Sequence, residues 1–409
     1  MALLDPLSGG PRILRAKATL PLVLTTLLSL IAAVAGCSSI IERQDVRPLV
    51  MRDVPAQRLA YRFEPDVALP NELQADESNQ KLAAIQTDFT TRRPDDALLR
   101  TVVSPDGQRA LALYGTEDDP GPSFRIDLYS ADGKFLRNLT PPDLACVFPE
   151  TVSWSSEGTL VAFIAHKNVK PSPSPTPPGR VAPEPEPSPG EAAPSPTIAP
   201  AFAAVATFNT EQIYVCNRDG YDLKPLTTRE GLIYFYFKWA PDNHALVALA
   251  CKEPEWDARE KGFKLPAGRA RLIALDGKER LLDDALTDCL PIWSPDSSKV
   301  ATAFEFDVAV FDAATNKPTQ ARIPLHDALI AASLAFAEKT SGSKRKNGEK
   351  DEKATGPPAS FNPIVRLDWP KPETIYMQTA FVRVYPNETI NTFQRWHRLN
   401  LSPQAAVLK

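Results

Sequence analysis

Residues 293–296 of this chain read Trp-Ser-Pro-Asp, and four further versions of this stretch decide the fold. A near copy, Trp-Ala-Pro-Asp-Asn, occupies residues 239–243, and weaker copies occupy 104–107, 154–158 and 369–373. Proline presets φ for an early turn position, Asp can accept hydrogen bonds from its own turn backbone, and Gly or Asn tolerates a positive φ. Each copy lies between short runs of strand-forming residues, so each predicts a tight turn between two strands.

The spacing of these turns predicts a repeat protein. The second motif residue marks the phase of each copy: Pro105, Ser156, Pro241, Pro295 and Pro370. Two of the intervals contain a low-complexity insertion, at 169–200 and at 338–360. With these left out, the copies follow one another every 51 to 54 residues. A steady period with strands inside it is typical of stacked structural repeats.

A second turn follows each copy and completes the repeat. These hairpin turns are expected at 131–134, 218–220, 276–278, 315–317 and 402–404. Strand-like runs precede most of them, at 125–129, 212–216, 271–275 and 308–311, and others follow the first motif, at 110–114, 160–164, 245–249 and 299–304. Each repeat is therefore predicted to be a four-stranded antiparallel unit, with strands a to d. The fold class is all-β, a β-propeller with such units as blades.

The number of blades depends on how the segment before the first repeat folds. Five blades can be identified from the sequence, and six are expected, with residues 57–96 supplying the missing sheet. Within that segment, residues 59–63 are expected to form a strand and 71–89 a helix. The fifth repeat is expected to have its own fourth strand at 405–408.

The turn motifs resemble those of a known family. Residues 293–296 and 104–107 are similar to the WD40-like β-propeller repeats of TolB and of the propeller domain of the dipeptidyl peptidase IV group. The resemblance extends over residues 97–409, and the copies at 154–158 and 369–373 depart from the family pattern. It implies a propeller fold and a scaffolding role in the bacterial cell envelope. Because a fold of this kind supports many functions, that role is an analogy.

The N-terminus predicts a lipoprotein signal. Arg12, Arg15 and Lys17 precede an apolar run at 20–35, which ends in Val-Ala-Gly-Cys at 34–37. This ending resembles the bacterial lipobox, which implies cleavage after residue 36 and acylation of Cys37, for example with palmitate. The alternative is an uncleaved membrane anchor, for which sixteen apolar residues are slightly short.

These features set the predicted organisation of the chain. Residues 1–36 are the signal peptide, 37–56 a tether and 57–409 the propeller domain. Ser38 after the lipidated cysteine resembles the outer-membrane signal of Gram-negative systems, so the domain is expected to face the periplasm. Among the residues of the domain, 169–200 are Pro-rich and should be extended and disordered, either as a spacer or as a partner ligand. The mixed charges at 338–360 predict a solvated, disordered loop.

The net charge bears on the class of partner, and the cysteine count bears on whether disulfides form. The chain has 46 Lys and Arg against 50 Asp and Glu, a net charge of −4, which disfavours nucleic acid as a partner. Beyond Cys37, the four cysteines can pair in an oxidising compartment. Cys251 and Cys289 are the favoured pair because both should lie near one rim on adjacent blades, and buried free thiols are the alternative. Their spacing predicts no zinc site.

Catalytic signals are weak in this sequence. It contains no Gly-x-Ser-x-Gly elbow and no His-Glu-x-x-His motif, and no cofactor is predicted. The carboxylates near the ends of the first strands could line a tunnel and hold a metal ion: Asp143, Glu150, Asp288 and Asp368. The leading interpretation is a non-catalytic, membrane-anchored scaffold that binds an envelope protein or a glycan. The alternative is a tunnel-site, metal-dependent hydrolase or lactonase-like enzyme.

Strand parity predicts where a partner would bind. Strands a and c run one way and b and d the other, so the tight turns share one rim and the long b–c loops lie on the opposite rim. Loops that vary on a rigid scaffold usually carry binding. The loop at 252–269 is the best candidate because it presents Trp256, Phe263 and Arg259, a mixture typical of contact surfaces. Alternatively, Trp256 and Phe263 fold back over the tunnel mouth.

Overall fold

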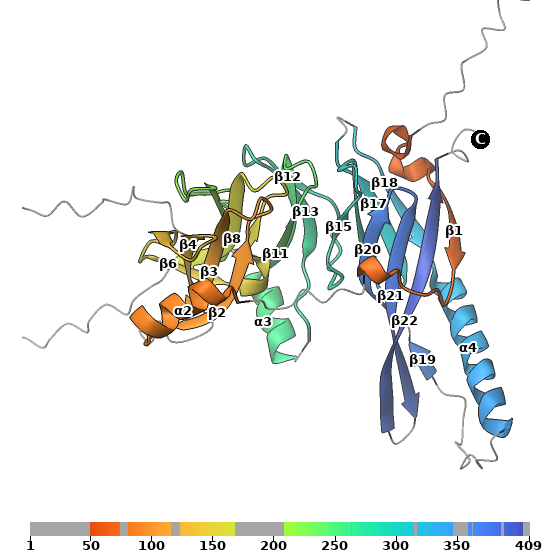
Figure 1. Ribbon diagram of the computed structural model, residues 1–409. Helices are drawn as coiled ribbons and strands as arrows, with labels where there is room; N and C mark the ends of the chain where they lie inside the picture. Colours follow the sequence, from red (N-terminus) through yellow and green to blue (C-terminus); the bar gives the residue numbers. More distant parts are fainter. Residues whose placement is uncertain are drawn as a thin grey trace, which may run out of the picture. The chain divides into compact units, whose positions relative to one another are not determined.

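The computed structural model describes residues 50–73, 81–115, 123–167, 208–262, 264–314, 317–346, 359–361, 363–385 and 388–403 (Figure 1). All of them belong to one unit, Val50–Lys409. The predicted signal peptide, Cys37 and the Pro-rich insertion lie outside the described residues, as does the expected strand at 405–408.

The described residues form five antiparallel sheets, and each of the first four follows the a-to-d order predicted from the repeat. The first sheet contains β2 (Ala97–Val103), β3 (Arg109–Gly115), β4 (Arg125–Ser130) and β5 (Phe135–Asn138). The second contains β6 (Leu144–Val147) and β7 (Ser153–Trp154), which both pair with β8 (Leu160–Lys167), followed by β9 (Gln212–Asn217) and β10 (Lys224–Pro225). The third contains β11 (Leu232–Trp239), β12 (Ala245–Lys252), β13 (Arg269–Ala274) and β14 (Glu279–Leu281). The fourth contains β15 (Ile292–Trp293), β16 (Lys299–Phe304), β17 (Asp307–Asp312) and β18 (Gln320–Pro324).

The fifth sheet is assembled differently from the other four. Its main path runs through β20 (Ile364–Lys371), β21 (Thr374–Tyr385), β22 (Glu388–Ser402) and β1 (Ala60–Glu64), with β19 (Ala359–Phe361) paired to the far end of β21. Its last strand therefore comes from the N-terminal part of the chain, in register from Ala60 opposite Ser402 to Glu64 opposite Arg398. The expectation that residues 57–96 form a sixth sheet is wrong for the residues described, because 60–64 complete the fifth sheet.

The tight turns have the hydrogen bonds that their sequence predicts. The hydroxyl of Ser104 donates to Asp106 Oδ1 at 2.6 Å, which fixes the turn between β2 and β3. Gly107 follows with a φ of +68°, where an L side chain would be strained. Asn243 and Ser297 hold the same position in later copies with φ of +63° and +59°.

The motif tryptophans join neighbouring sheets. The indole of Trp154 donates to the carbonyl of Val102 in the first sheet at 3.0 Å. In the same way, Trp293 of the fourth sheet donates to Lys238 of the third at 3.1 Å. Trp369, from the most divergent copy, donates within its own turn instead. Trp239, from the third sheet, has no hydrogen-bond partner for its indole nitrogen among the described residues, so the tryptophan adds a polar bond between sheets in two of the four copies that contain it.

Successive sheets pack face to face through four apolar clusters. Representative pairs are Leu111 with Phe163, Ile213 with Leu246, Val247 with Phe311, and Val310 with Met377. Strands sandwiched in this way are apolar on both faces, as the buried runs of β8 and β12 show. Among the clusters of the described residues, none joins the fifth sheet to the first.

The free face of the first sheet is covered by a helix. Ile85 and Phe89 of α2 (Ala83–Arg92) pack against Ala110, Ala112 and Tyr129. The helix predicted at 71–89 is thus shorter and later than expected, and only a 3₁₀ turn, η3 (Asn71–Leu73), stands at its predicted start.

The N-terminal strap, which we define as residues 50–64, fastens the other end of the stack. It contains two 3₁₀ turns, η1 (Met51–Asp53) and η2 (Ala56–Arg58), and then β1. Met51 and Ala56 are 2% and 0% exposed within the cluster between the fourth and fifth sheets. The backbone N–H of Ala56 donates to Asp312 Oδ2 at 3.0 Å. Residues 51–56 are therefore packed structure rather than the end of a free tether, contrary to expectation.

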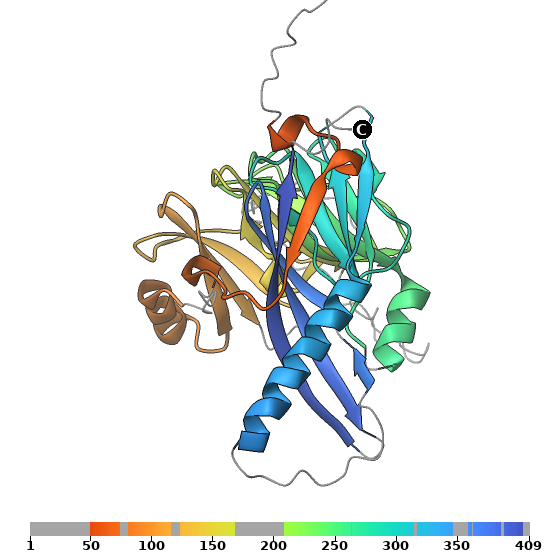
Figure 2. The same cartoon turned by 90° about the vertical axis from the view of Figure 1, so that its right-hand side faces the viewer.

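A long helix replaces part of the predicted charged loop. The helix α4 (His326–Lys346) continues to residue 346, and β19 begins at 359, so only part of 338–360 lies outside regular structure or outside the described residues. Leu329 and Ala332 on one side of α4 are buried, and Arg395 of β22 donates to the carbonyl of Ala332 at 3.1 Å. Figure 2 shows α4 running beside the strands of the fifth sheet. Alanine and leucine at helical spacing before the charged residues explain the helix. Within the described part of the chain, none of the helices has both the length and the apolar character needed to cross a membrane.

Candidate binding surfaces

The b–c loop predicted to bind a partner is turned toward its own chain. It forms the helix α3 (Glu253–Lys261), and the ring of Trp256 lies 5.8 Å from Phe148 and 5.5 Å from Phe235, centroid to centroid. These contacts place Trp256 partly inside the cluster between the third and fourth sheets, so its ring packs against its own chain. Phe263 lies outside the described residues.

The charged residues of this helix also bind within the chain. Glu255 accepts two hydrogen bonds from Arg269, at 2.7 and 2.9 Å, and hydrogen bonding from this arginine lowers the pKa of the Glu255 carboxyl. Arg259, the third residue predicted for partner binding, donates to the carbonyl of Leu265 at 2.5 Å and lies 3.3 Å from a carboxylate oxygen of Asp288. The structure therefore brings Trp256 and Arg259 together as residues that hold the loop.

The predicted disulfide is not formed. Cys251 and Cys289 are both free, buried thiols. Cys251 belongs to the cluster between the third and fourth sheets, whereas Cys289 belongs to the cluster between the fourth and fifth, so the two thiols fill different apolar layers. Burial raises the pKa of each thiol to about 12. These residues behave as small apolar side chains.

The carboxylates proposed for a metal site are not assembled. Asp288 pairs with Arg259, and Asp368 pairs with Arg366 at 2.9 Å. Asp143 precedes β6, and Glu150 lies in the 3₁₀ turn η4 (Pro149–Thr151). Within the residues that the structure describes, no three His, Cys, Asp or Glu side chains gather as a ligand set for a metal ion.

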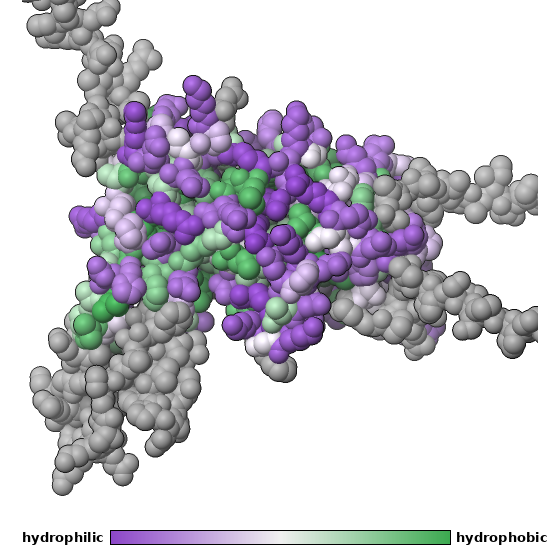
Figure 3. All heavy atoms as spheres, turned by 180° about the vertical axis from the view of Figure 1, so that it is seen from behind, coloured by the Kyte–Doolittle hydropathy of each residue, from purple (hydrophilic) through white to green (hydrophobic). Residues whose placement is uncertain are grey.

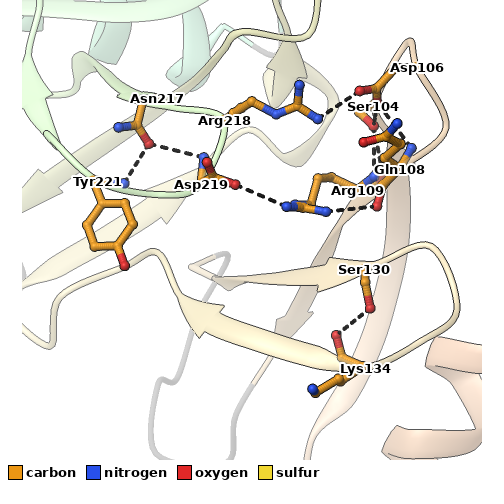
Figure 4. A network of polar contacts seen from close by, with 10 residues as sticks. All are labelled: Ser104, Asp106, Gln108, Arg109, Ser130, Lys134, Asn217, Arg218, Asp219 and Tyr221. Atoms are coloured by element: carbon orange, nitrogen blue, oxygen red, sulfur yellow. Dashed lines mark hydrogen bonds and ion pairs between the residues drawn. The ribbon is translucent and has the colours of Figure 1, made fainter.

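The rim that carries the tight turns is crossed by ion pairs (Figure 4). Arg218, from the turn after β9, lies 2.7 Å from Asp106 in the turn before β3, and Asp219 of the same turn lies 3.3 Å from Arg109. The hydrogen bond from Ser104, helped by backbone and Arg218 contacts, lowers the pKa of Asp106 to about 2. These charges tie the first sheet to the second.

The fifth sheet carries a different kind of surface, which we call the outer face. It consists of the side chains on the side of this sheet away from the fourth: Arg62, Glu64, Arg366, Asp368, Tyr376, Gln378, Gln394, Trp396, Arg398 and Asn400. Cross-strand register places seven of them in two rows. One row is Arg366, Gln378 and Trp396, and the other is Asp368, Tyr376, Arg398 and Glu64. The alternate positions, such as Leu367, Met377 and Leu399, face the fourth sheet.

The outer face combines paired charges, amides and an aromatic ring. Arg398 and Asn400 both donate to Glu64, the latter at 3.0 Å, and hydrogen bonding from Arg398 lowers the pKa of the Glu64 carboxyl. The guanidinium of Arg366 lies 5.6 Å from the ring centroid of Trp396.

Exposure differs along these two rows. The Arg366 side chain is 53% exposed and Trp396 is half-buried, whereas Tyr376 is buried at 9%. The row with Trp396 is therefore the more accessible one.

The sequence contained a signal for this surface that the motif search missed. Strands b of the second and third sheets, β8 and β12, are buried on both faces over most of their length. In β21 and β22, polar residues such as Gln378 and Asn400 alternate with apolar ones. Such alternation indicates a sheet with one uncovered face. On the side of the molecule seen in Figure 3, apolar areas are likewise small and interspersed among hydrophilic ones.

Comparison with known proteins gives only distant likenesses. The chain matches no family model and no curated protein sequence. Similar solved structures include an oligogalacturonate lyase in complex with manganese (TM-score 0.39, 10% identity, 84% of this chain and 72% of the other). They also include a putative TolB from Agrobacterium tumefaciens (0.29, 11%, 75% and 89%) and prolyl oligopeptidase B from Galerina marginata (0.40, 9%, 84% and 43%).

The class of protein follows from the sheets themselves. TM-scores of 0.40 or less and identities near 10% say nothing of activity, so the assignment rests on topology. Repeated four-stranded antiparallel sheets, stacked face to face with few helices, define an all-β protein of the propeller type.

Proposed function

We propose that this protein is a lipid-anchored, non-catalytic binding protein of the bacterial cell envelope, which holds an envelope protein or a glycan on its outer face. One observation carries the proposal. Every other broad sheet face of the described stack is part of an apolar cluster, whereas the outer face belongs to none of those clusters. A rigid sheet that presents polar and aromatic side chains at one end is suited to binding.

The N-terminal sequence supports the anchored location. With Cys37 as the acylated N-terminus, 12 residues lie between the lipidated cysteine and Val50, where the strap begins. A fully extended chain of that length reaches about 45 Å. The unit would therefore stay close to the membrane. Ser38, which resembles the outer-membrane signal of Gram-negative systems, would direct it to the outer membrane, facing the periplasm.

The pairing of charged residues supports binding over catalysis. A general acid, base or metal ligand requires a group whose chemistry is available to a substrate. Asp288 and Asp368, two of the carboxylates considered for a tunnel site, instead form ion pairs with arginines of their own chain. Asp127, which is buried, does the same with Arg93.

The anchor and the binding face are tested separately. Cys37→Ser should release the protein from membranes or leave an unprocessed precursor, which fractionation and mass spectrometry detect. A photocrosslinker at Arg366 should give adducts in cells, whereas one at Asp132, in the turn after β4, should give few. Adducts at Asp132 without adducts at Arg366 would contradict the outer face as the binding surface. Unchanged membrane extraction and processing of Cys37→Ser would contradict the anchor.

A further inference from the structure

We propose that the outer face binds an uncharged, linear glycan, with Trp396 as the platform on which a sugar ring stacks. This inference rests on the proposed function and adds the chemical class of the ligand. Four features carry it: the paired charges, the primary amides, the position of the indole, and the width of the surface.

Each arginine of the outer face has a carboxylate neighbour in the same sheet. Arg366 lies 2.9 Å from Asp368, whereas Arg398 and the exposed Arg62 share Glu64. An anionic ligand would therefore have to compete with these carboxylates. Charge complementarity thus favours a ligand with no net charge over an acidic polymer or a phosphate.

The amides provide hydrogen-bonding capacity suited to hydroxyl groups. Gln378 donates to Gln394 at 2.8 Å. A primary amide has two N–H donors and an oxygen with two lone pairs, so one mutual bond uses a small part of what the two residues offer. Sugar hydroxyls both donate and accept, and planar amides placed side by side on neighbouring strands can satisfy both roles.

Trp396 lies beside these amides. Gln378 and Trp396 are directly opposite in register on β21 and β22, and Arg366 lies opposite Gln378 on β20. An indole offers a flat apolar surface with a polar edge, which suits the C–H face of a sugar ring whose rim carries hydroxyls. The residue next to it on the same strand and face, Gln394, is exposed.

The width of the surface indicates a chain of sugars. The second row spans four strands, from Asp368 to Glu64. Neighbouring strands are about 4.8 Å apart, so four strands span about 14 Å. A protein partner fits less well because the centres of protein interfaces are depleted of charged residues, whereas charged residues stand at the middle of this face.

The test measures binding of two defined probes to the full-length protein in detergent. Chitohexaose is the uncharged probe and polygalacturonate the acidic one, and isothermal titration reports affinity. Chitohexaose is expected to bind, with Trp396→Ala and Gln378→Ala each weakening it tenfold or more, while Trp396→Tyr retains most of the binding. Tyr221→Ala is the matched control, because Tyr221 is a 55% exposed aromatic that also stacks on an arginine, Arg137, but lies on the rim of the second sheet. It should bind like wild type.

Three outcomes would overturn the inference. They are equal affinity of Trp396→Ala and wild type, binding of polygalacturonate alone, and no binding of chitohexaose at millimolar concentration. Thermal melts of each variant show whether a loss reflects unfolding. If chitohexaose fails while a crosslinker at Arg366 captures a protein, the ligand class is wrong and the proposed function stands. If both fail, the proposed function fails with it.

Discussion

The two ends of the sheet stack are finished in different ways. At the first sheet, α2 covers the free face with Ile85 and Phe89, and Arg93 forms an ion pair with the buried Asp127 at 2.6 Å. At the fifth sheet, the strap closes the edge, and the broad face beyond it is polar. An apolar face must be buried, whereas a polar one can remain in water. The difference is one of burial: one end of the stack is covered by a helix, and the other leaves a polar sheet face that we propose binds a ligand.

Removing the buried carboxylate that binds the strap should cause the largest loss in the free energy of unfolding. In Asp312→Ala, the ammonium of Lys299, 1% exposed and 2.8 Å from Asp312, loses its carboxylate partner, and Ala56 loses its acceptor. Although burial acts to raise the pKa of Asp312, the hydrogen bonds from Lys299, Thr319 and Ala56 keep it below the usual value. Breaking a buried ion pair costs about 3–5 kcal/mol. Denaturant unfolding measures the loss.

Hydrogen exchange shows whether that loss belongs to the strap end. In Asp312→Ala, protection should fall first in β1, β17 and β22, while α2 stays protected. An equal loss of protection in α2 would show that the two ends are not independent.

Truncating Phe89, which covers the first sheet, should cause the next largest loss in the free energy of unfolding. Phe89 is 2% exposed and packs on Tyr114 and Tyr129, with ring centroids 5.4 and 6.3 Å apart. Phe89→Ala removes most of this contact, and truncation of a buried Phe costs about 3 kcal/mol or more. Exchange protection should fall in α2 and β3 and remain in β1, the reverse of the Asp312→Ala pattern. Ligand binding at the outer face should not change.

The two ends each contain a buried titratable group, and the contributions of these groups to the free energy of unfolding should change with pH in opposite directions. Burial raises the pKa of Asp127 to about 6, so its contribution to stability is complete below pH 4 and lost as the pH rises to 6. Burial, with the nearby Arg395 charge, lowers the pKa of His397 to about 4, so its contribution is complete above pH 6.5 and lost as the pH falls to 4. Each accounts for about 2 kcal/mol across that window.

Variants separate the two slopes. His397→Gln should leave a protein whose unfolding free energy falls from pH 4 to pH 6, and Asp127→Asn one whose unfolding free energy rises over the same range. In wild type the two trends oppose each other. Parallel slopes in the two variants would mean that these groups do not titrate as their burial implies.

Removing an ion pair that lies at neither end of the stack should have the smallest effect on stability. Arg218 and Asp106 are about one-third exposed and lie between the first and second sheets. Ion pairs of this kind contribute little, because water and salt screen them. Arg218→Ala should melt close to wild type, and the double variant Arg218→Ala, Asp106→Ala should show weak coupling that disappears in high salt. Strong coupling would make the rim a third fastening site comparable to the strap.

Local sequence predicted the strands and turns well. Turns such as the one at Ser104 and Asp106 are fixed by residues two or three positions apart, so their chemistry can be read along the chain. The strand at residues 59–63 was identified as well, but its partner β22 lies more than 330 residues away and leaves no local mark. Because the sequence does not reveal this pairing, it assigns the strand to a separate sixth sheet instead of to the fifth.

The proposed binding surface is harder to predict from the sequence, for a related reason. Trp256 was taken as a contact residue because its neighbours in sequence are charged, but Phe148, more than 100 residues earlier, lies against it. Trp396 was not singled out because its importance depends on Gln378 and Arg366 on neighbouring strands. The alternation of polar and apolar residues in β21 and β22 was the local clue to that surface.

The strap also gives the molecule a mechanical axis. A pull on residue 50 first meets the buried Met51 and the Ala56–Asp312 hydrogen bond, and then reaches β1, which pairs with β22 along five residues. Tension directed along β1 loads those ladder bonds together, whereas tension across it opens them one after another. Because β22 also carries Trp396, force on the N-terminal side is transmitted to the sheet that bears the outer face. In the lipid-anchored protein that we propose, the tension along this path would depend on the distance between the membrane and the bound ligand.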